Sequence, residues 1–348
     1  MKGILILLAV ILVAVFFCGV LPAIQTNLLN IPVAARPFIT LPEEALTHHP
    51  LIDLPGEFND IYLTNVMIGT LLADLIVILL AVLFRVGLKE IPSGISNAVE
   101  ALFEVLHNMS EQVVGHKWVN RIFPIAASIF VFLIFVNWIE LVPGADSIGL
   151  LEHVEEDHTG HPVIPAGKIF GRDVYILDVN PQFAGGVTPE EAVDTGVDPE
   201  ERYQVVAFLR TPSTAINLPL GLAIISFITI QVFGALGLGI HYLAKFINTP
   251  ALERGGMGIM DFGVSFLELI LEPVKMISLT FRLLGNIFGG TVLLFVISTL
   301  IPFLVPVAIY GFEFFVGAIQ AYVFMMLTLV FSTMAMSGHG PEEAHEHA

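Results

Sequence analysis

An arginine stands in the middle of a long apolar stretch in the C-terminal third of the chain. Arg282 lies within Ser278-Leu-Thr-Phe-Arg-Leu-Leu-Gly-Asn-Ile-Phe-Gly-Gly290, whose other polar side chains are uncharged. A guanidinium group keeps its charge, so inside a membrane it must face a partner, a cavity or water. We therefore predict that Arg282 supplies a fixed positive charge on which the function depends.

Small residues follow the arginine at helical spacing. Gly285, Asn286, Gly289 and Gly290 remove side-chain bulk on nearly the same face of a helix as Arg282. Small residues in membrane helices allow another helix to approach closely. The pattern indicates a positively charged surface along which another helix moves.

The composition requires a membrane around these residues. Hydrophobic residues make up 55% of the chain and charged residues only 13%, and the mean hydropathy is +0.84. These values are typical of an integral membrane protein. The net charge of −18 argues against a nucleic-acid partner, and the single cysteine, Cys18, excludes a disulfide framework.

The predicted fold class is all-α, with about five transmembrane helices after an N-terminal signal or anchor segment. Residues 1–24 could be a cleaved signal peptide or a retained signal-anchor helix, and the sequence leaves both open. The apolar runs long enough to span a bilayer are 3–24, 61–84, 122–142, 214–243, 262–300 and 307–336.

The connecting segments set the predicted domain organisation. Within 25–143, which holds the first two family spans, periodic apolar residues at about 93–116 predict an amphipathic helix on the membrane surface. Lysines and arginines place the connectors after the second and fourth apolar runs in the cytoplasm. The loop 144–212 is rich in acids and reads as extracytoplasmic, 213–243 holds the next span, and the tail 337–348 reads as disordered.

The last two apolar runs are unusually long. Residues 262–300 would extend about 58 Å as one helix, against a hydrocarbon core of about 30 Å. We expect 262–336 to be a hairpin of two long, tilted helices that turns near Pro302 and Pro306. A turn centred near Ile301 places Arg282 opposite Gln320.

Polar residues recur along both predicted helices of this hairpin. A stripe on the first helix repeats every seven residues and consists of Glu268, Lys275, Arg282 and Gly289. A stripe on the second helix consists of Glu313, Gly317 and Gln320. With the turn near Ile301, Glu313 falls opposite Gly289 and Gly290. The stripes could be packing seams, or they could face one another across a wet interface, and for Glu268, Glu272 and Lys275 local pairing is an equal alternative.

These residues resemble the signature of the a subunit of F-type ATP synthases, the membrane stator that works against a rotating ring of c subunits. The resemblance rests on the run 278–286 and on three further stretches in the same order. They are Asn137-Trp-Ile-Glu-Leu-Val-Pro-Gly144, Leu209-Arg-Thr-Pro-Ser-Thr-Ala-Ile-Asn217 and Gln320-Ala-Tyr-Val-Phe-Met-Met. Together they cover about residues 60–336, apart from the acidic insert.

The resemblance implies ion translocation through two half-channels in a multi-pass protein of a bacterial plasma membrane. The expected ion is a proton, with Na⁺ as the alternative, and the implied partners are c-ring and peripheral stalk b subunits. In the family, the arginine matching Arg282 faces the ring carboxylates. The implied central residues are Arg282, Asn286, Glu313 and Gln320, and the implied channel or supporting residues are Glu268, Ser278, Gly285, Gly289, Gly290, Thr291 and Asn217.

The chain departs from the family pattern at places that concern the channel. Ala215 stands where many members carry aspartate, and Thr291 stands nine residues after the arginine, where a carboxylate or histidine is common. Glu313 occupies a position where members carry histidine or glutamate. We therefore expect that the acid of one half-channel has moved from the first helix of the hairpin to the second.

Other classes of function remain as alternatives at this point. A secondary transporter could hold an intramembrane arginine, although no internal repeat is visible, and a membrane scaffold would leave Arg282 unexplained. The chain has no GxxxxGK[ST] loop, so we expect no nucleotide chemistry in it. We expect no cofactor and no metal, because the acids and histidines near His153 match no defined metal site.

Overall fold

The computed structural model describes the two C-terminal helices, three earlier spans and part of the acidic insert. The described residues are 45–46, 62–87, 94–139, 141–142, 148–154, 160–169, 172–177, 187–188, 192, 198, 201–239, 242, 246, 256–300 and 305–337. The predicted first span at 3–24, and the tail apart from Ser337, lie outside these residues. The chain forms two compact units, which are described separately below: residues 1–72, 137–214 and 287–316, and residues 73–136, 215–286 and 317–348.

Long helices form where the hydropathy of the sequence predicts them. They are α3 (Asn65–Gly87), α4 (Ile95–Val114), α5 (His116–Ile139), α7 (Asn217–Leu238), α9 (Gly256–Leu300) and α10 (Val305–Met336). In the described part of the chain, five segments are long and apolar enough to cross a membrane: Asn65–Arg85, His116–Ile139, Asn217–Leu238, Gly263–Leu294 and Val307–Met336. The prediction of an all-α membrane protein is confirmed for these membrane-spanning segments.

The amphipathic segment between the first two of these spans forms α4. Gly94 and Gly115 flank it with φ angles of 67° and 82°, a backbone region that glycine adopts without steric cost. The Gly115 N–H donates to the Glu111 carbonyl at 2.8 Å and closes the last turn of the helix. Leu106 and Ser110, one turn apart on the same face, are buried, whereas Leu102 and Val105 are exposed.

The second unit is a helical bundle whose core contains hydroxyl groups as well as apolar side chains. Phe324, Met325 and Leu329 of α10 are fully buried. Ser226 of α7 and Thr328 of α10 are also fully buried, and their hydroxyl oxygens lie 2.7 Å apart. Hydrogen bonds of this kind hold membrane helices together, because lipid competes with the apolar contacts but not with the polar ones.

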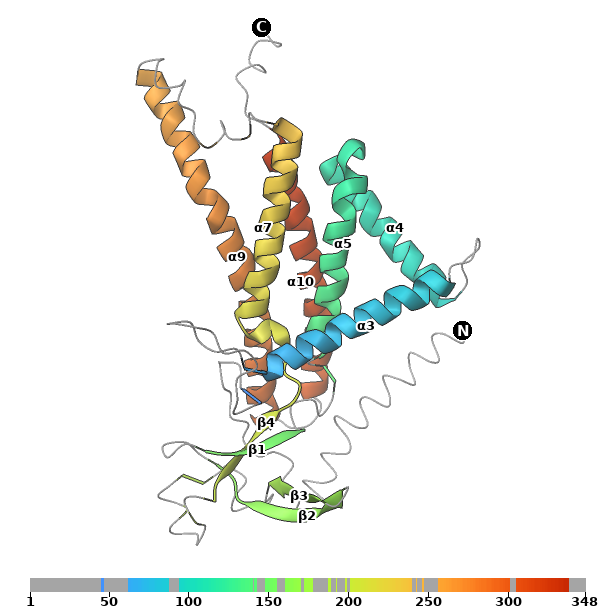
Figure 1. Ribbon diagram of the computed structural model, residues 1–348, viewed down its shortest axis with the longest axis vertical. Helices are drawn as coiled ribbons and strands as arrows, with labels where there is room; N and C mark the ends of the chain where they lie inside the picture. The colour runs from blue at the N-terminus through green and yellow to red at the C-terminus, as the bar shows by residue number, and fades with distance from the viewer. Residues whose placement is uncertain are drawn as a thin grey trace. The chain divides into compact units, whose positions relative to one another are not determined.

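The first unit contains strands that sequence analysis did not predict. Within the acidic insert, β1 (Gly149–His153) pairs antiparallel with β4 (Tyr203–Ala207), and β2 (Val163–Ile169) pairs antiparallel with β3 (Arg172–Leu177). Figure 1 shows the two pairs as separate ribbons. The Val, Ile and Tyr residues of β2, β3 and β4 favour strands, but the many acids, glycines and prolines of the insert obscured this preference.

Side-chain contacts of Asn137 and Trp138 tie the end of α5 into the first unit. The Ser213 hydroxyl donates to Asn137 Oδ1 at 2.9 Å, and both side chains are buried. Trp138 stacks on the ring of Phe314, with centroids 4.3 Å apart, and its Nε1 donates to the Phe314 carbonyl at 3.1 Å. The start of α10 is therefore held by the end of α5.

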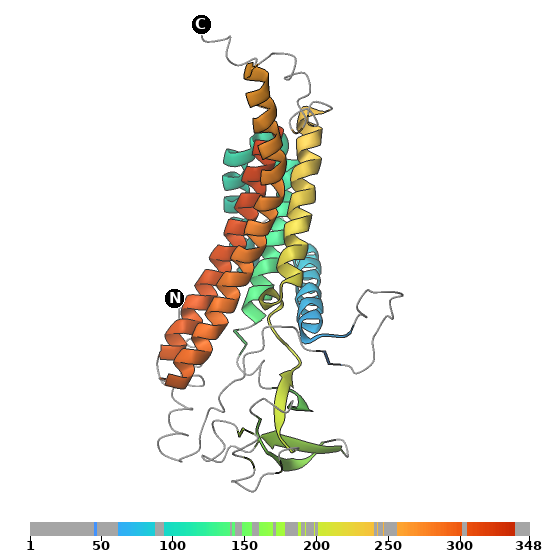
Figure 2. The same ribbon diagram turned by 90° about the vertical axis from the view of Figure 1, so that its left-hand side faces the viewer.

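The last two helices form the predicted antiparallel hairpin. α9 is a continuous helix of 45 residues that contains Pro273, and α10 has 32 residues. In the first unit, the end of α9 and the beginning of α10 lie side by side, as Figure 2 shows. The prediction of two long helices is confirmed, and α9 is unbroken.

Candidate functional site

Arg282 is exposed on the surface of α9. No hydrogen bond or ion pair joins it to any residue that the structure describes. The exposed positions continue along the helix at three-, four- and seven-residue spacing, which forms one stripe: Leu271, Ser278, Arg282, Gly285, Gly289, Leu293 and Val296. The neighbouring side of α9 carries the buried residues Glu272, Leu279, Leu283 and Ile287. The chain thus presents its mid-span charge outward.

The glycines beside Arg282 differ in what surrounds them. A Cβ added at Gly285 or Gly289 would meet no atom of the described chain within 4 Å. A Cβ at Gly290 would lie 2.9 Å from Oε1 of Glu313, closer than real Cβ contacts allow. Gly285 and Gly289 therefore leave space on the exposed stripe, whereas Gly290 makes room for a side chain of α10.

Asn286 and Gln320 join α9 to α10 one turn beyond the arginine. Asn286 Nδ2 donates to Gln320 Oε1 at 2.7 Å. Gln320 is buried, and its Nε2 has no hydrogen-bond partner among the described residues. A turn near Ile301 places Gln320 opposite Arg282, and the structure instead bonds it to the residue four positions later.

Glu313 is an acid enclosed by the hairpin. Both of its carboxyl oxygens are buried, and neither has a hydrogen-bond partner in the described part of the chain. Its neighbour in sequence, Phe314, is the residue on which Trp138 stacks and to whose carbonyl Trp138 donates. An unpaired buried carboxylate is costly, so this group calls for a proton, a water molecule or an ion. The predicted closeness of Glu313 to Gly290 is confirmed.

The remaining predicted residues lie in different surroundings. Ser278 is exposed one turn before Arg282, and Glu268 is half-buried about three turns further back. The Thr291 hydroxyl donates to the Ile287 carbonyl at 3.0 Å within its own helix. Asn217 begins α7 and belongs to a separate groove.

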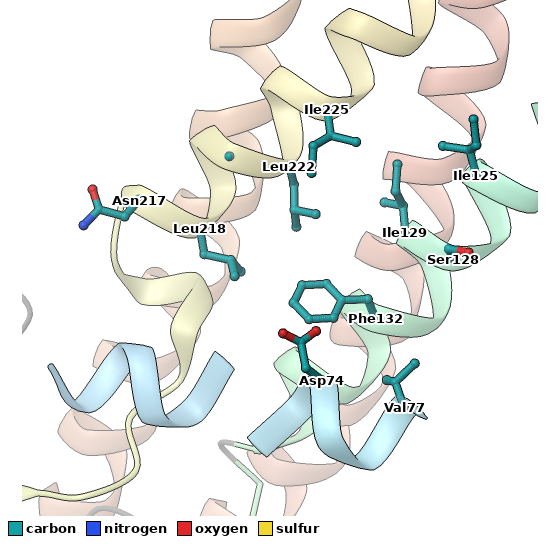
Figure 3. Close-up of a pocket in the computed structure, with 11 residues that line it drawn as sticks. Asp74, Val77, Ile125, Ser128, Ile129, Phe132, Asn217, Leu218, Leu222 and Ile225 are labelled. Carbon is teal, nitrogen blue, oxygen red and sulfur yellow. The ribbon is translucent and has the colours of Figure 1, made fainter. Parts of the chain in front are cut away.

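This groove has a volume of about 660 Å³ and lies between α3, α5 and α7 of the second unit. Its lining is apolar except at Asp74, Ser128 and Asn217. Figure 3 shows the Asp74 carboxyl beside the ring of Phe132, with the Asn217 amide turned away from it. Asp74 is exposed and has no hydrogen-bond partner among the described residues. Asp74 lies within the apolar run 61–84.

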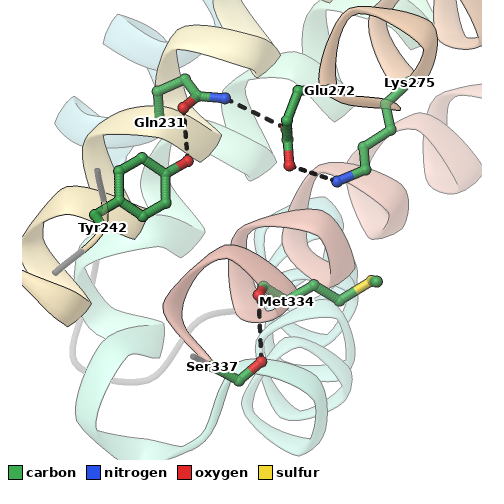
Figure 4. Close-up of polar contacts among 6 residues, drawn as sticks. All are labelled: Gln231, Tyr242, Glu272, Lys275, Met334 and Ser337. Carbon is green, nitrogen blue, oxygen red and sulfur yellow. Dashed lines mark hydrogen bonds and ion pairs between the residues drawn. The ribbon is translucent and has the colours of Figure 1, made fainter. Parts of the chain in front are cut away.

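The second unit contains a polar network that sequence analysis did not predict as a whole. The side chains of Tyr242, Gln231, Glu272 and Lys275 are linked in series by hydrogen bonds, as Figure 4 shows. The spacing of Glu272 and Lys275 indicated the pair, but nothing local indicated partners 41 residues away in sequence. Among the described residues, no group of three or more acids, histidines or cysteines could hold a metal ion.

Comparison with known proteins assigns the family. The model of the family described as "ATP synthase A chain" matches residues 66–333, which includes α9 with its outward arginine and the hairpin. The chain therefore belongs to the ATP synthase A chain family. It is similar to "ATP synthase subunit a" of Mycobacterium bovis, with 27% identity over 279 residues, which cover 78% of this chain and 87% of that protein. The protein of the same name from Marinomonas is 28% identical over 271 residues, which cover 74% of this chain and 78% of that protein.

Membership of the ATP synthase A chain family fixes the function class and the location. The chain is a multi-pass membrane protein whose function is ion translocation in an ATP synthase. A relative from Nitratiruptor, 25% identical over 269 residues and covering 77% of this chain and 88% of that protein, carries the same description. The alternatives of a secondary transporter and of a scaffold are therefore wrong.

Proposed function

We propose that this chain passes ions through two half-channels to and from the carboxylates of a c-ring, with Arg282 as the fixed charge between the channels. The observation that carries the proposal is that Arg282 is exposed at mid-span and has no hydrogen bond or ion pair to any described residue. An arginine in hydrocarbon without a partner is strongly disfavoured. Its partner must then come from another subunit.

The proposed partner of Arg282 is the ion-binding carboxylate of a c subunit. A positive charge a few ångströms away favours the ionised form of a carboxyl group and lowers its pKa. Each ring carboxyl group therefore releases its ion as it approaches Arg282 and takes up a new ion after passing. Because the guanidinium keeps its proton, it offers no path for direct transfer between the half-channels.

The neighbours of Arg282 support this role by leaving room. Gly285 and Gly289 have no described atom within 4 Å of a Cβ position, so a helix of the ring can approach α9 closely. Ser278 and Asn286 place small polar groups one turn on either side of the charge. Gln320 fixes Asn286 from α10.

Glu313 is the proposed ion-relaying group of one half-channel. Its buried carboxyl oxygens have no protein partner among the described residues, so both are available to a proton or to water. Thr291, whose hydroxyl bonds to its own helix, cannot exchange a proton in this way. Glu268, half-buried toward the other end of α9, is the candidate for the second half-channel.

The ion is expected to be a proton. Na⁺ remains the alternative, because the carboxyl group that selects the ion belongs to the c subunit. The peripheral stalk b subunits are the second proposed partner. We assign them the groove at Asp74, since an exposed carboxyl group in a span without a partner in the described chain requires cover by another membrane helix.

Replacement of Arg282 tests the proposal. We expect Arg282→Ala to assemble with the other subunits but to lose ATP synthesis driven by an imposed ion gradient in membrane vesicles. Arg282→Lys should support little ATP synthesis, because an ammonium group can lose its charge on burial. Phe281→Ala, at an exposed neighbouring position, is the matched control and should retain synthesis. Substantial synthesis by Arg282→Ala would refute the role.

A further inference from the structure

Four side chains form a hydrogen-bonded network at the point where α9 is weakest. Pro273 lies inside α9 and has no N–H to bond the carbonyl four residues earlier, so the helix has one fewer internal hydrogen bond there. The preceding residue, Glu272, is only 3% exposed although it lies in a span. The network is centred on the Glu272 carboxylate.

Every hydrogen bond in the network leads toward that carboxylate. Lys275 Nζ donates to Glu272 Oε1 at 2.7 Å, and Gln231 Nε2 of α7 donates to Glu272 Oε2 at 3.3 Å. The Tyr242 hydroxyl donates to Gln231 Oε1 at 2.6 Å. Lys275 Nζ also lies 5.5 Å from the ring centroid of Phe331 in α10. The network therefore connects α9 with both α7 and α10.

A turn after α7 places Tyr242 beside Gln231. Gly239 ends α7 with a φ of 61°, and the Tyr242 N–H donates to the Gly239 carbonyl at 3.2 Å, so the chain turns back. The Tyr242 ring then lies against Gly234, where a Cβ would collide with it. Burial, and then the charges of Glu272 and Glu268, raise the pKa of Tyr242 to about 12, so the hydroxyl keeps the proton that it donates.

The network is suited to holding helices and unsuited to carrying protons. Glu272 accepts from a cation and from an amide, and the amide of Gln231 separates it from the Tyr242 hydroxyl. An amide N–H does not release its proton at ordinary pH, so a proton cannot pass along this series. A buried carboxylate is stable when it is paired with a cation and its remaining lone pairs accept hydrogen bonds.

We propose that Glu272, with Gln231, Tyr242 and Lys275, is a brace that sets the rotation of α9 about its axis and so keeps Arg282 facing outward. This inference rests on the proposed function of Arg282. Glu272 precedes Arg282 by ten residues, which at 100° per residue turns the two side chains about 80° apart on the helix. Locking Glu272 against α7 thus turns Arg282 to the exposed side. Glu272 is a positioning residue and touches no transported ion.

The first test measures the rotation of α9 without reference to the c-ring. Spin labels at Ile228 of α7 and Phe281 of α9, both exposed, report the distance between these helices in the purified complex. We expect one narrow distance distribution in the parent protein and a broadened or shifted one in Glu272→Leu and Tyr242→Phe. An unchanged distribution in both variants would overturn the brace whatever the fate of the Arg282 proposal.

The second test separates a brace from an ion path. We expect ATP synthesis to fall about threefold in Tyr242→Phe, the effect of losing one hydrogen bond between membrane helices, and further in Glu272→Leu. Glu272→Gln with Lys275→Gln keeps donors and acceptors but removes both charges, and should restore most of the synthesis and the narrow distribution. If this double variant is as inactive as Glu272→Leu while its distance distribution is narrow, Glu272 carries ions and the brace is wrong. Tyr175→Phe, on an exposed strand residue, is the matched hydroxyl control.

Discussion

At the scale of single residues, the site depends on three side chains of the hairpin that differ in exposure and in hydrogen bonding. Arg282 is exposed and unpaired within the described chain, Glu313 is enclosed and unpaired there, and Gln320 is bonded to Asn286. A permanent charge that faces outward can act on another subunit, whereas an enclosed acid can exchange ions only along a wet path. Their surroundings, more than their residue types, separate their proposed roles.

The enclosed acid gives the first residue-scale prediction. Glu313→Gln keeps the shape of the side chain but removes the ionisable group, so we expect passive proton permeability of the membrane sector to fall strongly. Thr291→Glu in the same chain should recover part of the flux, because it returns an acid to the first helix of the hairpin. The measurement is proton flux through vesicles from which the catalytic sector has been stripped. Normal flux in Glu313→Gln, with normal assembly, would leave this residue only a structural role.

A comparison of two neighbouring glycines gives a second prediction. A Cβ at Gly290 meets Glu313 Oε1 at 2.9 Å, whereas a Cβ at Gly289 meets nothing in the described chain. We expect Gly290→Ala to displace the Glu313 carboxyl group and so to lower both the stability of the isolated chain and the proton flux through the membrane sector. Gly289→Leu should leave the isolated chain as stable as the parent but impair rotation-coupled synthesis in the complex. Thermal unfolding of the isolated subunit and ATP synthesis of the complex, measured on both variants, separate these effects, and equal behaviour would contradict the assignment.

At the scale of elements, α9 is defined by the difference between its two sides. Its exposed stripe runs through Ser278, Arg282 and Gly285, while Leu279 and Leu283 on the other side are almost fully buried. Small residues and one charge on the open side favour a moving partner over lipid, which needs neither. The packed side anchors the helix to α7 through Glu272, and Asn286, at the edge of the exposed stripe, bonds to α10.

The hydrogen bond between the hairpin helices gives an element-scale prediction. We expect Asn286→Ala and Gln320→Ala each to lower the free energy of unfolding by about 1 kcal/mol, within the range measured for hydrogen bonds between membrane helices. The double variant should cost less than the sum of the single ones, because both remove the same bond. Unfolding of the purified subunit in detergent measures this, and additive effects would show that the bond contributes nothing.

At the scale of the whole molecule, two surfaces of the chain are proposed to contact other subunits. One is the stripe around Arg282, proposed for the c-ring, and the other is the groove at Asp74. Each carries an ionisable side chain in a span with no hydrogen bond or ion pair to the described residues. A membrane subunit that leaves such groups open in isolation is one that acts inside an assembly.

Crosslinking distinguishes the two surfaces. A cysteine at Gly289 should form a disulfide with cysteines on the outer helix of a c subunit, and a cysteine at Gly221 in the groove should react with the membrane helix of the peripheral stalk. Each cysteine should fail with the other partner. Exchange of partners, or reaction of both cysteines with the ring, would show that the surfaces are assigned wrongly.

The sequence determined the features that depend on local composition. Runs of apolar residues predicted the five described spans, the long hairpin and the amphipathic α4, because hydropathy and helical periodicity act over neighbouring residues. The cost of a charge in hydrocarbon singled out Arg282 without any knowledge of its neighbours. The motif around it also gave the family, which the comparison confirms. Strands β1 and β4 of the acidic insert were not predicted, because their pairing joins segments 50 or more residues apart, from His153 with Tyr203 to Gly149 with Ala207.

Only the tertiary structure decided which of the polar residues face outward and which hold the bundle together. The bond from Asn286 to Gln320 and the bond from Gln231 to Glu272 join residues 34 and 41 positions apart in sequence, so they depend on the rotation and offset of packed helices. A turn near Ile301 placed Glu313 beside Gly290 correctly, yet the partner of Gln320 differs by one helical turn. Side-chain size and hydrogen-bond capacity at each crossing fix such details, and these become visible only when the helices are packed.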